Sequence, residues 1–208
     1  MKRRLFAHIA AVLAVAMLGL STVAHANDES PDALIKRLSD DVMSSIKADK
    51  SLQAGQTSAI MKLVDIKVMP NVNFQRMTAS AVGPAWRQAT PEQQKRLQDE
   101  FKTLLIRTYS GALAQVNDQV ITVKPQRGAA TDNEVVVRTE VRGRGDPVQL
   151  DYRLEKTATG WKIYNLNVLG VWLVETYRSQ FAQEINAKGV DGLIATLTER
   201  NRSNASKG

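Results

Sequence analysis

The feature that most constrains the fold of this chain is a change in the spacing of its apolar residues near the middle. Up to about residue 114 the apolar residues recur every three or four positions, which predicts amphipathic helices. Between residues 135 and 155 the period is two, which predicts strands with one apolar and one polar face. The helical spacing returns at about residue 171. We therefore expect an α+β protein in which helices pack on one face of an antiparallel sheet.

Helix-capping residues indicate where two of the helices begin. Ser30-Pro31-Asp32 offers an N-cap serine, a proline at the first helical position and an acidic first turn. Thr90-Pro91-Glu92-Gln93 has the threonine and glutamine of a capping box, and its helix is expected to end near Ala114. Further helices are predicted over residues 57–68, 71–82 and 171–188, with Gly189 after the last one and a short final helix carrying Leu193, Ile194 and Leu197.

The two-residue period belongs to a predicted sheet over residues 116–169. Val137 and Val141 share the apolar face of one strand, and Tyr152 lies on the apolar face of the next. Polar stretches at residues 127–133, 143–147 and 156–160 have the composition of hairpin loops. We predict a four-stranded antiparallel meander that encloses an apolar pocket together with the helices.

The N-terminal segment has the pattern of a cleavable signal peptide. Lys2, Arg3 and Arg4 precede an apolar run over residues 9–20, and Ala24-His25-Ala26 supplies the small-x-small cleavage pattern. An uncleaved membrane anchor is the alternative interpretation. We expect cleavage after residue 26, export across the cytoplasmic membrane, one soluble domain over residues 27–200 and a polar, frayed tail at residues 201–208.

Composition excludes several kinds of chemistry from the mature chain. The two histidines, His8 and His25, both lie in the predicted signal segment, and the sequence has no cysteine. Zinc held by histidine or cysteine, Ser-His-Asp or Cys-His hydrolysis and redox dithiols are therefore excluded. We expect no metal and no cofactor.

The positive charge does not indicate a nucleic-acid-binding protein. The formal net charge is +7, to which the predicted signal segment contributes three positive charges. The remaining basic residues are scattered, whereas nucleic-acid binding needs a basic stripe with interleaved aromatic residues. Weak attraction to anionic lipid headgroups and ordinary solubility both remain compatible with this charge.

Short motifs that suggest other sites are better explained as local structure. Arg144-Gly145-Asp146 spells an integrin-type tripeptide, but a hairpin turn needs the same residue types. Asp40 and Asp41 are adjacent on a helix and point in different directions, so we interpret them as a solvated face. Neither G-x-S-x-G nor S-x-x-K occurs to activate a serine. The sequence predicts no catalytic group.

Two stretches carry a resemblance to a known family. Residues 73–113 read NFQRMTASAVGPAWRQATPEQQKRLQDEFKTLLIRTYSGAL, and residues 163–197 read IYNLNVLGVWLVETYRSQFAQEINAKGVDGLIATL. Their order of aromatic, glycine and capping residues resembles the MlaC, or toluene-tolerance, family of periplasmic phospholipid carriers. The chain departs from the family pattern at Asn165, Leu169 and Trp172, where aspartate, glutamate and serine are expected. These departures put in doubt any headgroup or partner contact made at those positions.

The resemblance implies a periplasmic protein, expected to be a monomer, that holds a glycerophospholipid as cargo. It would exchange the lipid with an outer-membrane lipoprotein–porin complex and with an inner-membrane ABC transporter that carries an MCE-type protein. That pathway maintains the lipid asymmetry of the outer membrane. Two lobes would open slightly during transfer, for which Gly83 or Gly170 would suit a hinge, and Arg107 and Arg178 are candidates for phosphate neighbours.

Acyl chains would be held by apolar residues from both the predicted helices and the predicted sheet. We predict as tail-lining residues Phe74, Met77, Leu104, Tyr109, Val137, Val141, Tyr152, Leu166, Val168, Val171, Trp172, Val174 and Tyr177.

Two other functions remain open on the sequence alone. An exported enzyme on a cone-shaped α+β fold, like those of the nuclear-transport-factor-like group, would need an acidic base inside its pocket. No Asp or Glu interrupts the apolar face of the predicted strands. A periplasmic chaperone that binds apolar peptides is the third hypothesis.

Overall fold

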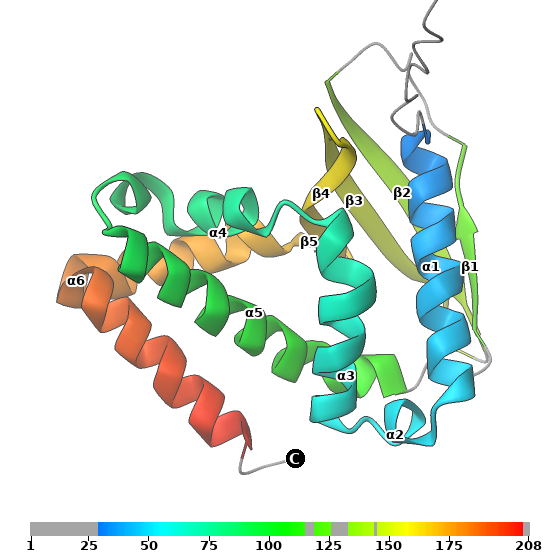
Figure 1. The fold of residues 1–208 in the computed structure, drawn as a ribbon, viewed down its shortest axis with the longest axis horizontal. Coiled ribbons are helices and arrows are strands. Elements are labelled where there is room, and N and C mark those ends of the chain that lie inside the picture. Colours follow the sequence, from blue (N-terminus) through cyan, green and yellow to red (C-terminus); the bar gives the residue numbers. More distant parts are fainter. Residues whose placement is uncertain (1–28, 115–118, 126–132, 144, 206–208) are drawn as a thin grey trace, which may run out of the picture.

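The structure is a computed structural model that describes residues 29–114, 119–125, 133–143 and 145–205. The expected α+β architecture is confirmed, with helices beside one antiparallel sheet (Figure 1). The predicted signal peptide, residues 1–26, lies outside the described residues. In the described part of the chain, no helix is both long and apolar enough to span a membrane.

Helices α1 to α5 precede the five strands along the chain, and helix α6 follows them. The helices are α1 (Pro31–Ala48), α2 (Lys50–Gln53), α3 (Thr57–Leu63), the π-helix η1 (Val64–Val68), the 3₁₀-helices η2 (Met69–Asn71) and η3 (Gly83–Arg87), α4 (Phe74–Val82), α5 (Pro91–Ala114) and α6 (Leu173–Ala205). The strands are β1 (Val120–Val123), β2 (Glu134–Arg142), β3 (Val148–Thr157), β4 (Gly160–Val168) and β5 (Val171–Trp172).

The predicted caps form as the sequence indicates. The hydroxyl of Ser30 accepts a hydrogen bond from the backbone N–H of Ala33 at 3.3 Å, which caps α1. At the start of α5, the N–H of Gln93 donates to the Thr90 hydroxyl and the Thr90 N–H donates to the Gln93 side chain. This is the reciprocal pair of a capping box, and it explains why a helix that begins at Pro91 is stable through to Ala114.

The sheet is a meander in which each strand pairs with the next along the chain, in the order β1 to β5. The fifth strand was not predicted. Leu169 and Gly170 adopt φ values of 54° and 85°, which reverse the chain and let Val171 pair with Val168. α6 therefore begins at Leu173, two residues later than expected.

Three helix boundaries also differ from the sequence-based expectation. The helix predicted over residues 57–68 is α3 followed by the π-turns of η1. Val72 is extended and bridges to Ile163, so α4 begins at Phe74 behind an Asn73 cap. Helix α6 kinks at Gly189 and continues to Ala205.

The polar tail was expected to begin at residue 201, but Asn201 is buried in a helical segment. Its side-chain amide donates to the backbone oxygen of Glu100 at 2.9 Å and to the carboxylate of Glu100 at 2.7 Å. Because these bonds join the end of α6 to α5, the polar residue belongs to the folded core and the prediction of a frayed Asn201 was wrong.

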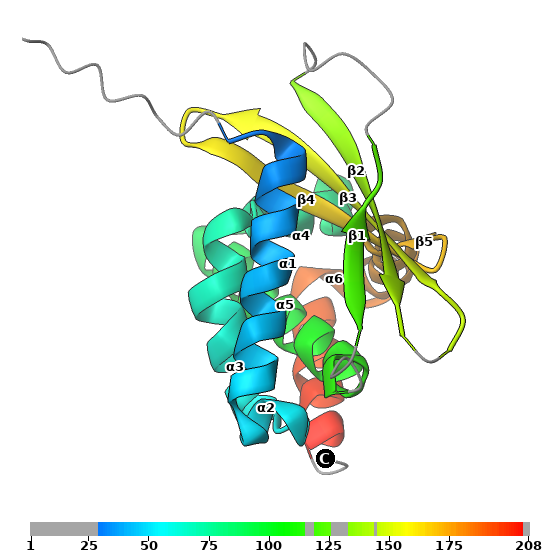
Figure 2. The ribbon, with the colours of Figure 1, turned by 90° about the vertical axis from the view of Figure 1, so that its right-hand side faces the viewer.

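Two packed regions hold the fold together. In the first, Leu97 and Phe101 of α5 pack against Phe181, Leu193 and Leu197 of α6, and all five are at most 1% exposed. We call these five residues the helical core. In the second, Leu34 and Leu38 of α1 pack on Val137, Leu154 and Ile163 of the sheet. Figure 2 shows α1 running along the sheet on the side where the other helices lie.

Candidate functional site

The two faces of the sheet differ in chemistry. Tyr152 pairs with Val137 on one side and with Leu166 on the other, so these three residues share a face. Asp151 pairs with Arg138 and Asn167, which therefore share the opposite face. We call the first the inner face, because Val137 and Tyr152 pack with α1 residues and Leu166 packs with residues of α4, α5 and α6.

The structure brings most of the predicted tail-lining residues to this inner side. One apolar cluster gathers Phe74, Met77, Leu104, Tyr109, Leu166, Val168, Val174 and Tyr177 from α4, α5, β4 and α6. A second, neighbouring cluster holds Val137 and Tyr152. These ten residues come from distant parts of the sequence, and the fold gathers them in two neighbouring apolar clusters.

Three predicted residues are not brought into either cluster. Val141 is buried on β2 but belongs to neither cluster, and Val171 is 50% exposed in β5. Trp172 pairs with Asn167 and its ring lies 3.9 Å from the guanidinium carbon of Arg153, on the outer face. The Leu169–Gly170 turn explains this placement, because it makes residues 171 and 172 a strand rather than the first turn of α6.

The inner face is only partly covered along β3 and β4. Leu150, Tyr152, Leu166 and Val168 form adjacent pairs on it, and all four keep part of their surface accessible. Leu150 was missed as a site residue, although its alternation with Tyr152 was visible in the sequence. Half-covered apolar side chains on an inward face leave surface that a ligand can bury.

Tyr152 has a desolvated phenol on the inner face. Burial raises the pKa of its phenol, while hydrogen bonds with the side chains of Thr139 and Ser39 partly oppose that rise. Tyr152 thus packs with α1 residues on the inner face and keeps part of its surface accessible. No sequence signal identified Ser39, which reaches the interior from α1.

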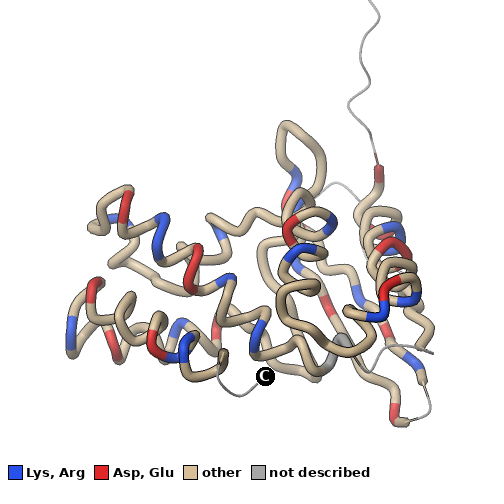
Figure 3. Tube along the Cα trace, turned by 60° about the horizontal axis from the view of Figure 1, so that its bottom comes forward, with Lys and Arg blue, Asp and Glu red and all other residues tan. Residues whose placement is uncertain are grey.

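Charged residues tie the helices to the outer face of the sheet. Arg76 of α4 forms ion pairs with Glu134 and Glu155, and its guanidinium lies 3.7 Å from the ring centre of Tyr164. Arg153 of β3 pairs with Glu175 of α6. The cations and anions are intermixed along the described chain, as Figure 3 shows, which agrees with the absence of a basic stripe in the sequence.

Asn165 connects β4 to the first turn of α6. Its side-chain oxygen accepts hydrogen bonds from the N–H groups of Leu166 at 2.9 Å and Val174 at 3.1 Å. Its amide nitrogen donates to Glu175 at 2.8 Å. Burial alone would raise the pKa of Glu175, but hydrogen bonds from Asn165 and Arg153 lower it, so the carboxylate is charged at neutral pH.

The two arginines considered as phosphate neighbours have different surroundings. Arg107 donates to the backbone oxygen of Asn201 and so joins α5 to the end of α6. Arg178 is exposed, and its Nε atom lies 3.7 Å from the position that a side chain at Gly83 would occupy. Arg178 is thus exposed and Arg107 is partly buried, and the role of either as a phosphate neighbour stays a prediction.

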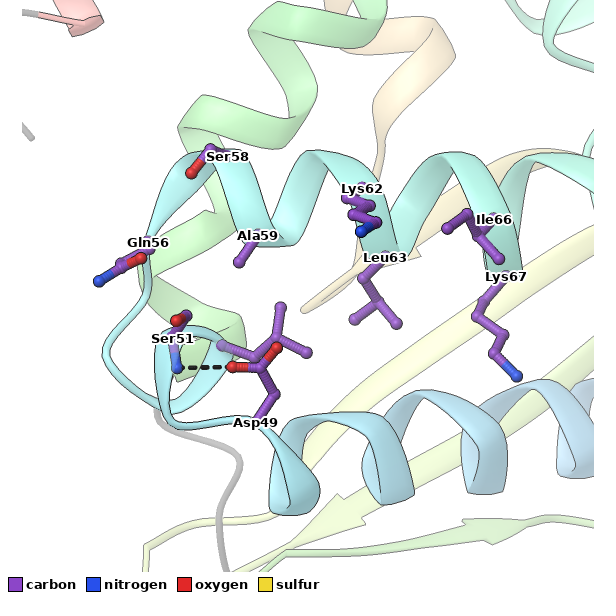
Figure 4. A pocket seen from close by; sticks show the side chains of 10 residues that line it. Asp49, Ser51, Gln56, Ser58, Ala59, Lys62, Leu63, Ile66 and Lys67 are labelled. Atoms are coloured by element: carbon purple, nitrogen blue, oxygen red, sulfur yellow. Dashed lines mark hydrogen bonds between the residues drawn. The ribbon is translucent and has the colours of Figure 1, made fainter.

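A separate groove lies between α2 and α3, and none of the predicted site residues lines it. Its volume is about 500 Å³, and Asp49, Lys62 and Lys67 give it charge of both signs. Figure 4 shows Leu63 pointing into the groove and Gln56 pointing away from it. In the described residues, no cluster of three or more acidic side chains suited to a metal ion is found.

Comparisons with known proteins agree on one family. Toluene tolerance protein ttg2D of Pseudomonas putida is 29% identical over 165 residues, covering 78% of this chain and 76% of that protein. The intermembrane phospholipid transport system binding protein MlaC of Haemophilus influenzae is 22% identical over 176 residues, covering 83% and 82%.

A solved structure is similar to this chain in fold. The phospholipid-binding protein from Ralstonia solanacearum, determined in complex with a phospholipid, matches with a TM-score of 0.82 and 50% identity. The match covers 84% of this chain and 98% of that one. A model of the MlaC protein family matches residues 36–199, which contain both apolar clusters almost entirely. The chain belongs to the MlaC family.

Proposed function

We propose that this protein is a carrier that binds a glycerophospholipid by its acyl chains, between the inner face of the sheet and helices α1, α4, α5 and α6. The observation that carries this proposal is the Ralstonia solanacearum structure, which contains a phospholipid and shares half of its aligned residues with this chain. The partly accessible inner face gives the same proposal an independent basis in the residues of this chain.

The energetics of lipid transfer require such a carrier. Moving one methylene group from an apolar environment into water costs about 0.8 kcal/mol. A phospholipid with about thirty methylenes therefore faces a cost of roughly 20 kcal/mol if it crosses water unaided. Burying the chains removes that cost, while the headgroup can stay hydrated. The process needs neither a nucleophile nor a proton transfer.

The place and partners of the carrier are part of the proposal. The predicted signal peptide would export the chain to the periplasm. There it would exchange lipid with an outer-membrane lipoprotein–porin complex and an inner-membrane MCE-protein/ABC transporter, and so maintain outer-membrane lipid asymmetry. The name of the Haemophilus influenzae relative, a binding protein of an intermembrane phospholipid transport system, supports this role.

The placement of acidic residues favours the carrier over an enzyme. An enzyme on this scaffold would need a carboxylate facing the apolar interior. Asp151 is buried in the middle of the sheet, but it pairs with Arg138 and Asn167 on the outer face. Tyr152, its neighbour, is the residue that faces inward. We therefore propose binding and transfer, without a chemical step on the lipid.

Native mass spectrometry tests this proposal. Protein purified from the periplasm should carry one phospholipid per chain, which solvent extraction would identify. The delipidated protein should take up labelled phospholipid from liposomes. A protein that is empty as purified and takes up no lipid would refute the proposal. A surface variant, Lys36→Ala on an exposed part of α1, should retain lipid as the wild-type protein does.

A further inference from the structure

The turn between β4 and β5 places a leucine at positive φ, where leucine is uncommon. Val168 and Val171 form the last pair of the hairpin, and Leu169 and Gly170 make the two-residue turn with φ values of 54° and 85°. Turns of this kind favour asparagine, aspartate or glycine at the first position, because a branched side chain is strained at positive φ. Leucine at position 169 therefore makes the turn less stable than asparagine would.

Packing does not compensate for this strain. The side chain of Leu169 is 66% exposed and that of Val171 is 50% exposed. A Cβ atom added at Gly170 would meet nothing within 4 Å, so the space around the turn is open. Two adjacent apolar side chains are thus held in water on a strained backbone. Such a feature is expected where a surface binds something outside the folded chain.

The turn is held firmly at its base. The N–H of Gly170 donates to the side chain of Asn167 at 2.8 Å, and the N–H of Leu169 donates to the backbone oxygen of Gln149 at 3.1 Å. These bonds hold the backbone of the turn in place at residues 169 and 170. Figure 2 shows β5 and its turn at one edge of the molecule.

The residues behind the turn change in polarity over a short distance. Leu169 and Val171 form the apolar tip, Trp172 follows with its ring partly exposed, and the guanidinium of Arg153 covers that ring at 3.9 Å. Arg153 is itself paired with Glu175 of α6, so the features that carry the inference are the apolar tip and Trp172. Apolar side chains followed by a tryptophan occur in proteins that enter a bilayer interface, where the tryptophan lies at headgroup level.

We propose that the tip formed by Leu169, Gly170 and Val171 inserts into the apolar layer of a phospholipid surface and holds the protein there transiently. This inference rests on the proposed function, since it assigns the carrier a contact with the membrane from which or to which lipid moves. The tip is distinct from the cargo interior, because neither Leu169 nor Val171 belongs to the two apolar clusters.

Leu169→Asn separates membrane binding from stability. Asparagine adopts positive φ more easily than leucine, so the variant should unfold at a temperature equal to or above that of the wild-type protein. Its apolar side chain is lost, so its binding to vesicles of phosphatidylethanolamine and phosphatidylglycerol should fall by about tenfold in co-sedimentation. Because the variant is not destabilised, weaker binding could not be attributed to misfolding.

Ile66→Asn is the matched control. Ile66 is 58% exposed at the groove between α2 and α3, away from the turn, and its replacement removes a comparable apolar side chain. We expect this variant to bind vesicles as the wild-type protein does. Equal vesicle binding by wild-type protein and Leu169→Asn would overturn the proposal. So would a wild-type protein that binds no vesicles, in which case the tip serves a protein partner or a second copy of the chain.

Trp172 supplies a direct reporter of insertion. Trp86, Trp161 and Trp172 are the three tryptophans of the chain, so Trp86→Phe and Trp161→Phe leave Trp172 alone. Phospholipids brominated on the acyl chains should quench its fluorescence, and Leu169→Asn should abolish the quenching. Native mass spectrometry of Leu169→Asn should still detect bound phospholipid. If lipid were absent from wild-type protein as well, the proposed carrier function would fail, whatever the vesicle result.

Discussion

The helical core and the inner face of the sheet are built from similar residues but packed differently. In the helical core, the ring of Phe101 meets Phe181 at 5.2 Å and Tyr177 at 4.9 Å, both edge-on, and leaves no accessible surface. On the inner face, Tyr152 and Leu166 keep part of their surface accessible. Apolar composition alone therefore does not identify a ligand site. The difference is whether other side chains already fill the space.

The largest predicted effect is in the helical core. Phe101→Ala should lower the free energy of unfolding by about 3–5 kcal/mol, because it removes a fully buried ring and leaves a cavity. Urea denaturation followed by circular dichroism measures this loss. A cost below about 1 kcal/mol would show that the helical core is not closed and would remove the contrast with the inner face.

Asn165→Asp tests the link between α6 and the sheet. The variant loses the hydrogen bond to Glu175 and places two carboxylates together, which should cost about 1–3 kcal/mol at neutral pH. Repulsion raises the pKa values of such a pair, so the variant loses stability as pH rises through them. In the wild-type protein the pKa of Glu175 is lowered by folding. This lowering stabilises the fold at pH values above the pKa of Glu175 in the unfolded chain, and the contribution is lost as the pH falls through its pKa in the folded protein.

Melting temperatures measured across pH distinguish these two behaviours. The difference in melting temperature between Asn165→Asp and the wild-type protein should be largest at neutral pH and should decrease towards about pH 4. Adding Glu175→Gln should recover part of the loss at neutral pH, since the new amide can donate a hydrogen bond to the carboxylate introduced by Asn165→Asp. A gap that does not change with pH would contradict the assigned role of Asn165.

On the inner face, truncation should cost less stability and more lipid binding. Leu166→Ala should lower the free energy of unfolding of the delipidated protein by about 1–2 kcal/mol, below the roughly 2–5 kcal/mol of a closed core site. Its retention of phospholipid should fall, as quantified by extraction and mass spectrometry. A loss of unfolding free energy of roughly 2–5 kcal/mol with unchanged lipid content would instead show that Leu166 belongs to closed core.

The smallest effect is expected on the solvated surface. Lys36 and Asp40 of α1 form an ion pair at 2.7 Å, with side chains 68% and 61% exposed. Lys36→Ala should change the free energy of unfolding by less than about 0.5 kcal/mol, because exposed pairs are solvated and screened. A thermal shift at two salt concentrations checks this, and a loss above about 1 kcal/mol would indicate a contact that the structure does not contain.

The sequence predicted those parts of the fold that local chemistry determines. The cap at Thr90 and the alternation along β2 and β3 depend on neighbours within a few residues, and both were confirmed. The β4–β5 hairpin was missed, because leucine at its first turn position conceals the turn that Gly170 completes. The burial of Asn201 depends on Glu100, about a hundred residues away, and no local pattern indicates it.

The sequence indicated which kinds of residue form the candidate site, but not which of them are closed core and which keep accessible surface. The family resemblance, together with helical and two-residue spacing, led to the selection of Met77, Leu104 and Leu166, which the fold places in one cluster. These signals were not enough to separate Val137, which is fully buried, from Tyr152, which keeps accessible surface. Val171 and Trp172 were assigned to the interior because a helix was expected to begin there, and the extra strand moved them.

The most direct test of the central contrast is photocrosslinking with a phospholipid that carries a diazirine on one acyl chain. After irradiation of the loaded protein and digestion, peptide mass spectrometry locates the modified residues. We predict crosslinks on β3 and β4, at Tyr152, Leu166 and Val168, and none on the helical core residues Phe101, Leu193 and Leu197. Crosslinks concentrated in the helical core, with the inner face unmodified, would contradict the account.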